Sequence, residues 1–178
     1  ESEFLSLFKP GQRVYVGAYT NEPKGLIELL AADGEKANGV TFIQQPLFIN
    51  QIDLSSLAPE SRMATFFMTP ALQRGLSKGR IDYIPMQMRA VYDYIQGCSL
   101  DIVLLQVAKD INGEIRFGPG MEFVQAALDG AATVVLQVNT EMTAPIGCPP
   151  LEMNASYLLL EKACPPILYP KPAVKSVE

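Results

Sequence analysis

The stretch LDIVLLQVA, residues 100–108, decides the fold. Apolar residues fill almost all of its positions, so both faces of a strand formed here are apolar. Strands that face water on one side alternate between apolar and polar residues, whereas strands of parallel sheets are covered on both faces and form continuous apolar runs. The stretch therefore predicts a central parallel strand, and ATVVLQV at residues 132–138 predicts a second one.

Outward from these two stretches, short apolar segments alternate with amphipathic ones. Further strands are expected within residues 13–18, 39–45, 63–69 and 80–85, and helices within residues 23–34, 70–79, 89–97 and 120–131. This alternation indicates βαβ units. We therefore predict an α/β fold: an open, mostly parallel sheet with helices on both faces. Such sheets bind ligands in the crevice beyond the carboxyl ends of their strands.

Composition excludes several classes of function. The 178 residues are 48% hydrophobic, which suits one domain with a sizeable core. The net charge of -5 and the scattered Lys and Arg residues argue against a nucleic-acid partner. The chain contains no histidine, which removes Ser-His-Asp catalysis, Cys-His catalysis and histidine metal sites. We expect no metal site.

Cysteine usage and hydropathy bear on location. Cys98, Cys148 and Cys164 are widely spaced, which argues against a disulfide framework or a zinc site and favours the reducing cytosol. No apolar run approaches the ~20 residues that a membrane span needs. The first residues lack the basic and then apolar pattern of a signal peptide. We therefore predict a cytoplasmic protein without a membrane partner.

The last residues differ from the rest in composition. CPPILYPKPAVKSVE, residues 164–178, holds four prolines within eight residues. Prolines this dense cannot join a helix or an interior strand, and they favour an extended spacer. We predict that the α/β domain spans residues 1–161 and that residues 162–178 form a Pro-rich linker or arm.

Three loops follow predicted strands and are candidates for a site. In GAYTNEPKG, residues 17–25, a glycine lets a ligand approach the backbone, and the helix that begins near Pro23 offers free N–H groups to an anion. An ordinary turn with a good helix cap is the simpler interpretation. AKDINGEIRFGPG, residues 108–120, is either a hairpin that merely connects or a long loop over the crevice.

The third loop is VNTEMTAPIG, residues 138–147. Here the apolar strand is expected to stop at Asn139, whose amide can donate and accept at the strand end. Met142 offers a soft apolar contact, and Gly147 permits an unusual backbone angle. The alternative is a structural crossover in which Asn139 only ties down its own loop.

Other side chains are weaker candidates. Glu22, Glu114 and Glu141 are the loop carboxylates. Cys148 is a possible nucleophile, but without histidine its thiolate needs another source of activation. Arg74 and Arg80 are either solvated charges on a helix and at a strand edge or ligands of a phosphate.

Four stretches occur in an order that is specific when they are taken together. FFMTPALQRGLSKGRIDYIP (residues 66–85) joins an aromatic strand, an Arg and a Gly-Arg pair, and DIVLLQVAKDINGEIRFG (101–118) joins a strand and an Asp-x-x-Gly turn. VVLQVNTEMTAPIG (134–147) has a V-N-x-x-M loop, and GAYTNEPKGLIELL (17–30) has an acidic-Pro pair that opens a helix. In this order they resemble the N-terminal half of the acetyl-CoA hydrolase and 4-hydroxybutyrate CoA-transferase family.

The resemblance implies a CoA-transferase that moves CoA between an acyl-CoA and a small carboxylate of the acetate, 4-hydroxybutyrate, succinate or itaconate type. In this family a glutamate forms a glutamyl-CoA intermediate, and that glutamate belongs to the second half of the protein. The resemblance thus implies no catalytic residue in this chain and inactivity without the second half. It also implies coenzyme A as a substrate, no tightly bound cofactor, and a homo-oligomer.

The same resemblance places the site residues. The wall that holds the acyl group or the acceptor carboxylate is expected to consist of Gly17, Tyr19, Thr20, Asn21, Glu22, Pro23, Asn139, Met142 and Gly147. The loop over the cleft is expected to use Asp110, Gly113 and Gly118. Ala108, Glu114 and Thr143 depart from the family pattern. They are expected at the crevice, so the departures affect which substrate is bound more than they affect the fold. Two alternatives stay open: an acyl-CoA hydrolase of the same family, and a non-catalytic module that binds a small anion.

Overall fold

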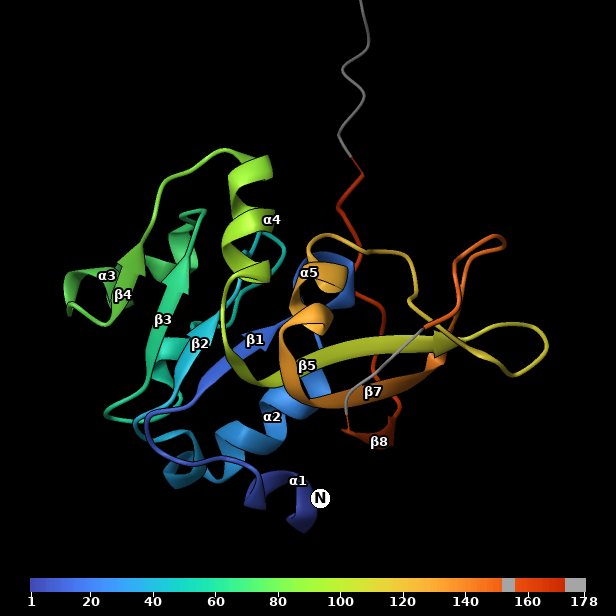
Figure 1. Cartoon of the computed structure of the whole chain (residues 1–178), viewed down its shortest axis with the longest axis horizontal. Helices are drawn as coiled ribbons and strands as arrows, with labels where there is room; N and C mark the ends of the chain where they lie inside the picture. Colours follow the sequence, from blue (N-terminus) through green and yellow to red (C-terminus); the bar gives the residue numbers. More distant parts are fainter. Residues whose placement is uncertain (152–155, 172–178) are drawn as a thin grey trace, which may run out of the picture.

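A computed structural model of the protein describes residues 1–151 and 156–171. Its centre is an eight-stranded sheet in which seven strands follow the order β4-β3-β2-β1-β5-β7-β8 and pair in parallel, while β6 pairs antiparallel with β5 (Figure 1). Helices cover both faces. The α/β fold predicted from the sequence is therefore confirmed.

The middle of the sheet is built from the two apolar stretches. β5 (Leu100–Lys109) lies between β1 (Arg13–Val16) and β7 (Ala131–Thr143), with Val14 opposite Ile102 and Val103 opposite Val134. Each of these four residues is at most 1% exposed. The continuous apolar character of both stretches thus reflects burial on two faces.

Shorter strands extend the sheet on both sides. β2 (Thr41–Ile43), β3 (Arg62–Thr65) and β4 (Ile81–Tyr83) continue it beyond β1, and β8 (Ser156–Lys162) flanks β7. The two-residue β6 (Ile115–Arg116) forms a hairpin with the end of β5. The sequence between residues 108 and 120 is thus a hairpin, which was one of its two interpretations.

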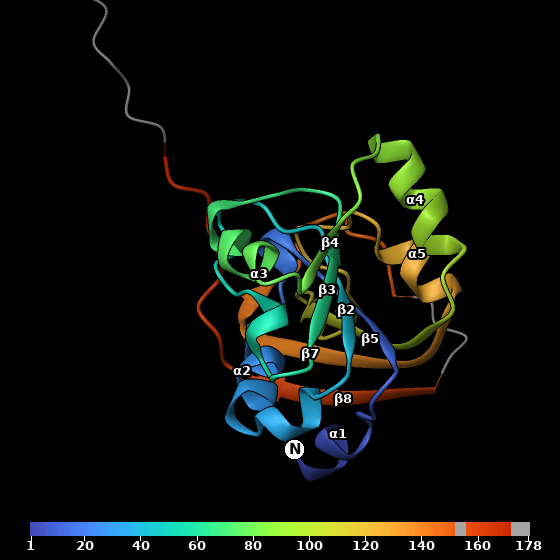
Figure 2. The ribbon, with the colours of Figure 1, turned by 90° about the vertical axis from the view of Figure 1, so that its left-hand side faces the viewer.

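Two apolar layers hold helices against the sheet. α4 (Met88–Gln96) and α5 (Val124–Asp129) pack on one face, and α1 (Ser2–Ser6), α2 (Lys24–Ala32) and α3 (Gln73–Ser77) lie on the other (Figure 2). Short 3-10 turns η1 (Tyr19–Asn21), η2 (Gly34–Ala37), η3 (Leu54–Ser56) and η4 (Pro70–Leu72) complete the connections.

The structure differs from the sequence prediction in three places. β7 does not stop at Asn139 but continues to Thr143, which pairs with Lys109 after a register shift in β5. Main-chain pairing extends the strand here even though Thr140, Glu141 and Thr143 are polar. β8 and α1 are additional elements that the sequence reading missed.

The Pro-rich segment was expected from residue 162 onward. β8 includes Lys162, and residues 163–171 follow without regular structure. Within them Cys164 is buried, and the ring of Tyr169 packs edge-on against Phe48 with centroids 5.6 Å apart. This part of the arm therefore lies on its own domain. Residues 172–178 of the predicted linker fall outside the described residues, and the domain boundary stays a prediction.

Across the described ranges, no helix has both the length and the apolar character that a bilayer crossing requires.

Candidate functional site at the carboxyl ends of the strands

Buried polar side chains gather where the parallel strands end. Eight of them, on and after β1, β2, β5 and β7, are less than 5% exposed. Burying an amide or carboxyl group costs free energy unless the group is hydrogen-bonded. A concentration of buried polar side chains is therefore a candidate for a binding or catalytic site. We call these residues the edge cluster: Asn21, Glu22, Gln44, Gln45, Asn50, Gln106, Gln137 and Asn139.

The turn after β1 holds Tyr19, the one non-glycine residue of the two described ranges with a positive φ. Tyr19 has φ +54°, a left-handed conformation that costs a bulky residue free energy. Asn50 holds it there: its Oδ1 accepts from the Tyr19 N–H at 3.0 Å, and its Nδ2 donates to the Tyr19 carbonyl at 3.0 Å. The Tyr19 hydroxyl accepts from Gln45 at 3.0 Å. The turn is therefore fixed by side chains that follow β2.

Glu22 is an almost fully buried carboxyl group in this turn. It is 2% exposed, and its Oε1 accepts a hydrogen bond from Gln44 Nε2 at 3.2 Å. Burial raises the pKa of Glu22 to about 7, although hydrogen bonds from Gln44 and Asn50 oppose the rise. Glu22 therefore exchanges its proton near neutral pH, as general acids and bases do.

Glu122 is a second carboxyl group whose pKa lies well above that of a solvated glutamate. Burial raises its pKa to about 8. Its charge contributes, after burial, to raising the pKa of Tyr19 to about 12, so the two groups lie close together. A Cβ built on Gly120 would lie 2.4 Å from Glu122 Oε1 and 3.2 Å from Thr20 Oγ1. Close packing at this glycine thus brings Glu122 against the turn.

Sequence reasoning missed Glu122 because it falls in a segment that reads as helix. The structure starts α5 only at Val124, which leaves Glu122 in the preceding loop. Its position between Met121 and Phe123, beside an apolar run, was the only signal in the sequence.

Four oxygen atoms of this region are buried without a hydrogen-bond partner among the described residues. They belong to Asn21, Gln44, Gln45 and Glu122. Buried polar atoms are nearly always paired, and each exception calls for an explanation. These oxygens are available to a bound molecule that donates hydrogen bonds, and a protonated Glu122 can itself donate one.

Asn21 joins the turn to the hairpin loop. Its Nδ2 donates to the Phe117 carbonyl at 3.0 Å and also to the Gly120 carbonyl. Gly118, at φ +93°, passes so close that a Cβ there would lie 3.3 Å from Asn21 Oδ1. The predicted cleft loop and the predicted wall are therefore in contact.

Asn139 is bonded as a structural residue. Its Nδ2 donates to Gln106 Oε1 at 3.2 Å and to the Cys164 carbonyl at 2.8 Å, and its Oδ1 accepts from the N–H groups of Glu141 and Cys164. Asn139 thus ties down its own strand and the arm. These contacts favour the structural alternative, while a role in binding stays a prediction.

The start of α2 is covered, contrary to the expectation of an open anion site there. Gln137 Oε1 accepts from the Leu26 N–H at 3.1 Å. A Cβ on Gly25 would meet Gln137 Oε1 at 3.0 Å and the sulfur of Cys164 at 3.2 Å. The side chains of β7 and the arm occupy the place that an anion would take.

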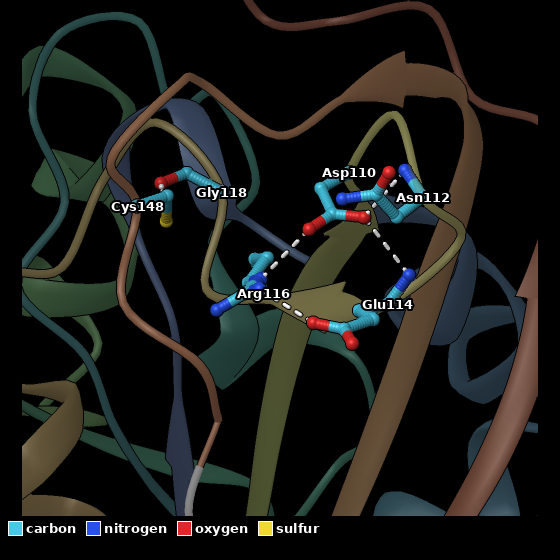
Figure 3. A network of polar contacts seen from close by, with 6 residues as sticks. All are labelled: Asp110, Asn112, Glu114, Arg116, Gly118 and Cys148. Atoms are coloured by element: carbon cyan, nitrogen blue, oxygen red, sulfur yellow. Dashed lines mark hydrogen bonds and ion pairs between the residues drawn. The ribbon is translucent and has the colours of Figure 1, made fainter.

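The hairpin loop forms a separate hollow of about 260 Å³ with residues that follow β7. Arg116 lines it: Nε donates to Asp110 Oδ2 at 3.0 Å, and Nη2 donates to Glu114 Oε2 at 2.5 Å (Figure 3). Gly147 and Cys148 line its other side. The hollow therefore gathers part of the predicted loop and part of the predicted wall.

Asp110 and Cys148 act within this loop as structural groups. Desolvation raises the pKa of Asp110, but the N–H groups of Glu114 and Asn112, with Arg116, hold it below its usual value. Gly113, at φ +85°, completes the turn. The Cys148 thiol donates to the Gly118 carbonyl at 3.2 Å, as a packed thiol does.

The predicted site residues thus separate into two groups. Gly17, Tyr19, Thr20, Asn21 and Glu22 lie together at the edge cluster, where Gln44 donates to the Gly17 carbonyl and Gln106 donates to the Thr20 carbonyl. Pro23 is buried directly after them. Met142 lies on β7 beyond Asn139, and Gly147 lies at the hairpin hollow. Within the described part of the chain, no group of three or more Cys, Asp or Glu residues has the geometry to hold a metal ion.

Comparison with protein families gives a match over most of the chain. Residues 1–147 match the acetyl-CoA hydrolase/transferase N-terminal domain. No curated protein matches the sequence significantly.

Solved structures share the fold at low sequence identity. RipA from Yersinia pestis is 16% identical with a TM-score of 0.73, and the match covers 98% of this chain and 44% of RipA. A 4-hydroxybutyrate CoA-transferase from Porphyromonas gingivalis is 18% identical with a TM-score of 0.61, over 94% of this chain and 39% of that chain. Glutaconate CoA-transferase from Acidaminococcus fermentans is 9% identical with a TM-score of 0.55, over 88% and 73%. The chain spans less than half the length of the first two proteins.

Proposed function

Because the chain belongs to the acetyl-CoA hydrolase/transferase family, as its N-terminal domain, we propose that it supplies one wall of a CoA-transferase cleft. The reaction moves CoA between an acyl-CoA and a small carboxylate. The lengths of RipA and of the 4-hydroxybutyrate CoA-transferase support a second half that this chain does not contain.

In the proposed reaction a glutamate of the second half attacks the thioester carbonyl and forms an acyl–glutamyl anhydride with release of the CoA thiolate. The thiolate attacks the glutamyl carbonyl, which gives glutamyl-CoA and releases the carboxylate product. An acceptor carboxylate then reverses the two steps. Neither half-reaction needs a proton donor, so the work of this chain is to bind and orient the carboxylate.

The observation that carries the proposal is a pair of carboxyl groups at the turn: Glu22, which is buried, and Glu122, which is partly exposed but has a buried oxygen. Their raised pKa values keep Glu122 mostly protonated and Glu22 partly protonated at pH 7. A neutral carboxylic acid donates a hydrogen bond to a carboxylate, whereas an ionised one repels it. The turn therefore accepts an anionic substrate as long as these protons stay in place.

The test uses the assembled enzyme, in which this chain is joined to its second half. Glu122→Ala is expected to raise KM for the acceptor carboxylate about 10-fold or more, since a buried hydrogen bond to a charged group contributes roughly 1.5–3 kcal/mol. Glu122→Gln keeps a hydrogen-bond donor that does not ionise. Its KM for the acceptor carboxylate is therefore expected to stay low and not to rise above pH 8. Glu28→Gln, on the exposed face of α2, is the matched control.

Two results would count against this assignment. Equal KM values at all pH values for Glu122→Ala and the unaltered protein would remove the carboxyl group from binding. CoA transfer by the 178-residue chain alone, at rates typical of enzymes, would refute the second-half glutamate.

A second candidate is acyl-CoA hydrolysis, and the pKa of Glu22 near 7 favours it. The ionised form of Glu22 would act as a general base that takes a proton from water as the water attacks the acyl group. The two reactions differ in pH dependence. Hydrolysis rises as pH passes 7, whereas carboxylate binding for transfer falls as pH passes 8. Measuring acyl-CoA loss with and without acetate over this range separates them.

A further inference from the structure

A basic hollow lies on the side of the domain where α3 and η3 meet, away from the edge cluster. It encloses about 320 Å³ and is lined by two serines, Gly75, Ala71, one carboxylate and three cations: Ser55, Ser56, Asp53, Arg74, Lys78 and Arg80. None of these residues belongs to the edge cluster or to the hairpin hollow. The hollow is therefore a separate place on the surface.

The packing of α3 against η3 brings the charges together. A Cβ on Gly75 would lie 2.5 Å from Ser55 Oγ and 2.6 Å from Asp53 Oδ2, so only glycine permits this approach. Arg74 and Lys78 stand on either side of Gly75 along the chain, and the Arg80 N–H returns to the Gly75 carbonyl at 3.0 Å. The close packing at Gly75 and the turn after α3 thus place Arg74, Lys78 and Arg80 around one hollow.

The three cations make no ion pair with any residue in the two described ranges, whereas the neighbouring Arg62 pairs with Asp82 at 3.0 Å. Asp53 is the one carboxylate in the lining, and its Oδ1 is already bonded to the N–H and hydroxyl of Ser55 at 3.0 and 2.6 Å. The lining keeps a net positive charge on a chain whose total charge is -5. Such a local concentration attracts anions.

We propose that this hollow binds a phosphate-bearing anion, with Arg74, Lys78 and Arg80 as its ligands. Arginine side chains present paired N–H groups that match phosphate oxygens, and lysine adds a point charge. The volume lies at the lower end of the range for ligand sites, which suits a diphosphate group rather than a whole nucleotide. The chemistry is shared by free inorganic pyrophosphate and by the phosphates of a nucleotide.

The test is titration calorimetry of the protein at low ionic strength. One arm uses inorganic pyrophosphate, and the other uses adenosine 5′-diphosphate, which carries the same diphosphate group on a nucleoside. We expect saturable binding in at least one arm, and weakening of about 10-fold or more in Arg74→Gln and in Arg80→Gln. Lys36→Gln removes an exposed cation that does not line the hollow and is expected to bind as the unaltered protein does. Stronger binding of one compound than of the other identifies the source of the phosphate.

A second measurement does not depend on the folding of variants. Phenylglyoxal modifies arginines, and pyrophosphate is expected to slow modification of Arg74 and Arg80 in the unaltered protein but not that of Arg89. Absence of saturable binding in both arms would overturn the proposal. Equal weakening in Lys36→Gln, or uniform protection of all arginines, would overturn it as well, because either result indicates nonspecific attraction.

Discussion

The turn after β1 and the hairpin after β5 present the same kind of side chain in opposite states. In the hairpin, Asp110 accepts two backbone N–H groups and a guanidinium, and its pKa is lowered. Near the turn, Glu122 has a buried oxygen without a partner among the described residues, and burial raises its pKa to about 8. One carboxylate is stabilised in its charged form, and the other is held in its neutral form.

The difference separates structure from function within one edge of the sheet. A fully bonded carboxylate such as Asp110 stabilises the fold and has little left to offer a ligand. A buried carboxyl group with a free oxygen weakens the fold and persists where binding or catalysis needs it. By this criterion we propose the turn as the functional place and the hairpin as the scaffold that holds it through Asn21.

The largest expected effect is on how stability depends on pH. The pKa of Glu22 is raised from 4.5 to about 7 in the folded protein. Its ionisation therefore lowers the free energy of unfolding, by an amount that is absent below pH 4.5 and grows until pH passes 7. Glu22→Gln removes this loss and is expected to gain on the order of 3 kcal/mol at pH 8 relative to the unaltered protein, when both are referenced to pH 4.5. Urea denaturation at the two pH values measures it. An unchanged difference between the two pH values would place Glu22 in contact with water.

Replacing Asn139 is expected to show how much a side-chain amide with all its hydrogen bonds made contributes to the free energy of unfolding. Asn139→Ala leaves the Gln106 side chain and the Cys164 main chain without partners, which costs roughly 2 kcal/mol. Denaturant unfolding gives this value, with Thr140→Ala on the exposed side of the same strand as control. A loss of activity at unchanged stability would instead return Asn139 to the binding wall.

A smaller effect of opposite sign is expected for Asp110. Because its pKa is lowered in the folded protein, its contribution is present at pH 7 and disappears as pH falls through that lowered pKa. Asp110→Asn is expected to lower the melting temperature by a few degrees at pH 7 and to match the unaltered protein in acid. Glu35→Gln, exposed on η2, controls for loss of a surface charge. Equal melting temperatures at pH 7 would mean that the hairpin does not depend on this carboxylate.

The smallest effect is expected for Cys148. Its thiol donates one hydrogen bond to the Gly118 carbonyl, and a serine hydroxyl can do the same. In the proposed assembled enzyme, Cys148→Ser is therefore expected to keep CoA-transfer activity within a factor of two, and in this chain to change stability by less than about 1 kcal/mol. Loss of activity in a normally folded variant would restore the cysteine as a nucleophile.

Hydrophobic pattern was enough to predict the sheet. Residues 100–108 and 132–138 lie in β5 and β7. Both strands are buried on two faces, and such burial requires an apolar run that can be recognised in the sequence. The family prediction is confirmed by the match over residues 1–147. β8 and the extension of β7 to Thr143 escaped prediction, because both depend on main-chain pairing with a distant strand.

The site was only partly predictable for a similar reason. The turn that contains Tyr19, Asn21 and Glu22 follows a predicted strand, so its place on the functional edge could be read from order alone. Gln44 and Asn50 come from the loop after β2 and Glu122 comes from the loop before α5, and only the fold brings them to the turn. Burial also decides which carboxyl group is perturbed, and a local sequence pattern does not carry that information.

Carbon-13 NMR titration of the side-chain carboxyl groups tests the central claim most directly. With each group assigned by its Gln or Asn variant, Glu22 is expected to titrate near pH 7 and Glu122 near pH 8, while Asp110 titrates below its ordinary range. Midpoints of Glu22 and Glu122 near 4.5, the value for a solvated glutamate, would show that the turn carries two ordinary surface charges and would contradict the account.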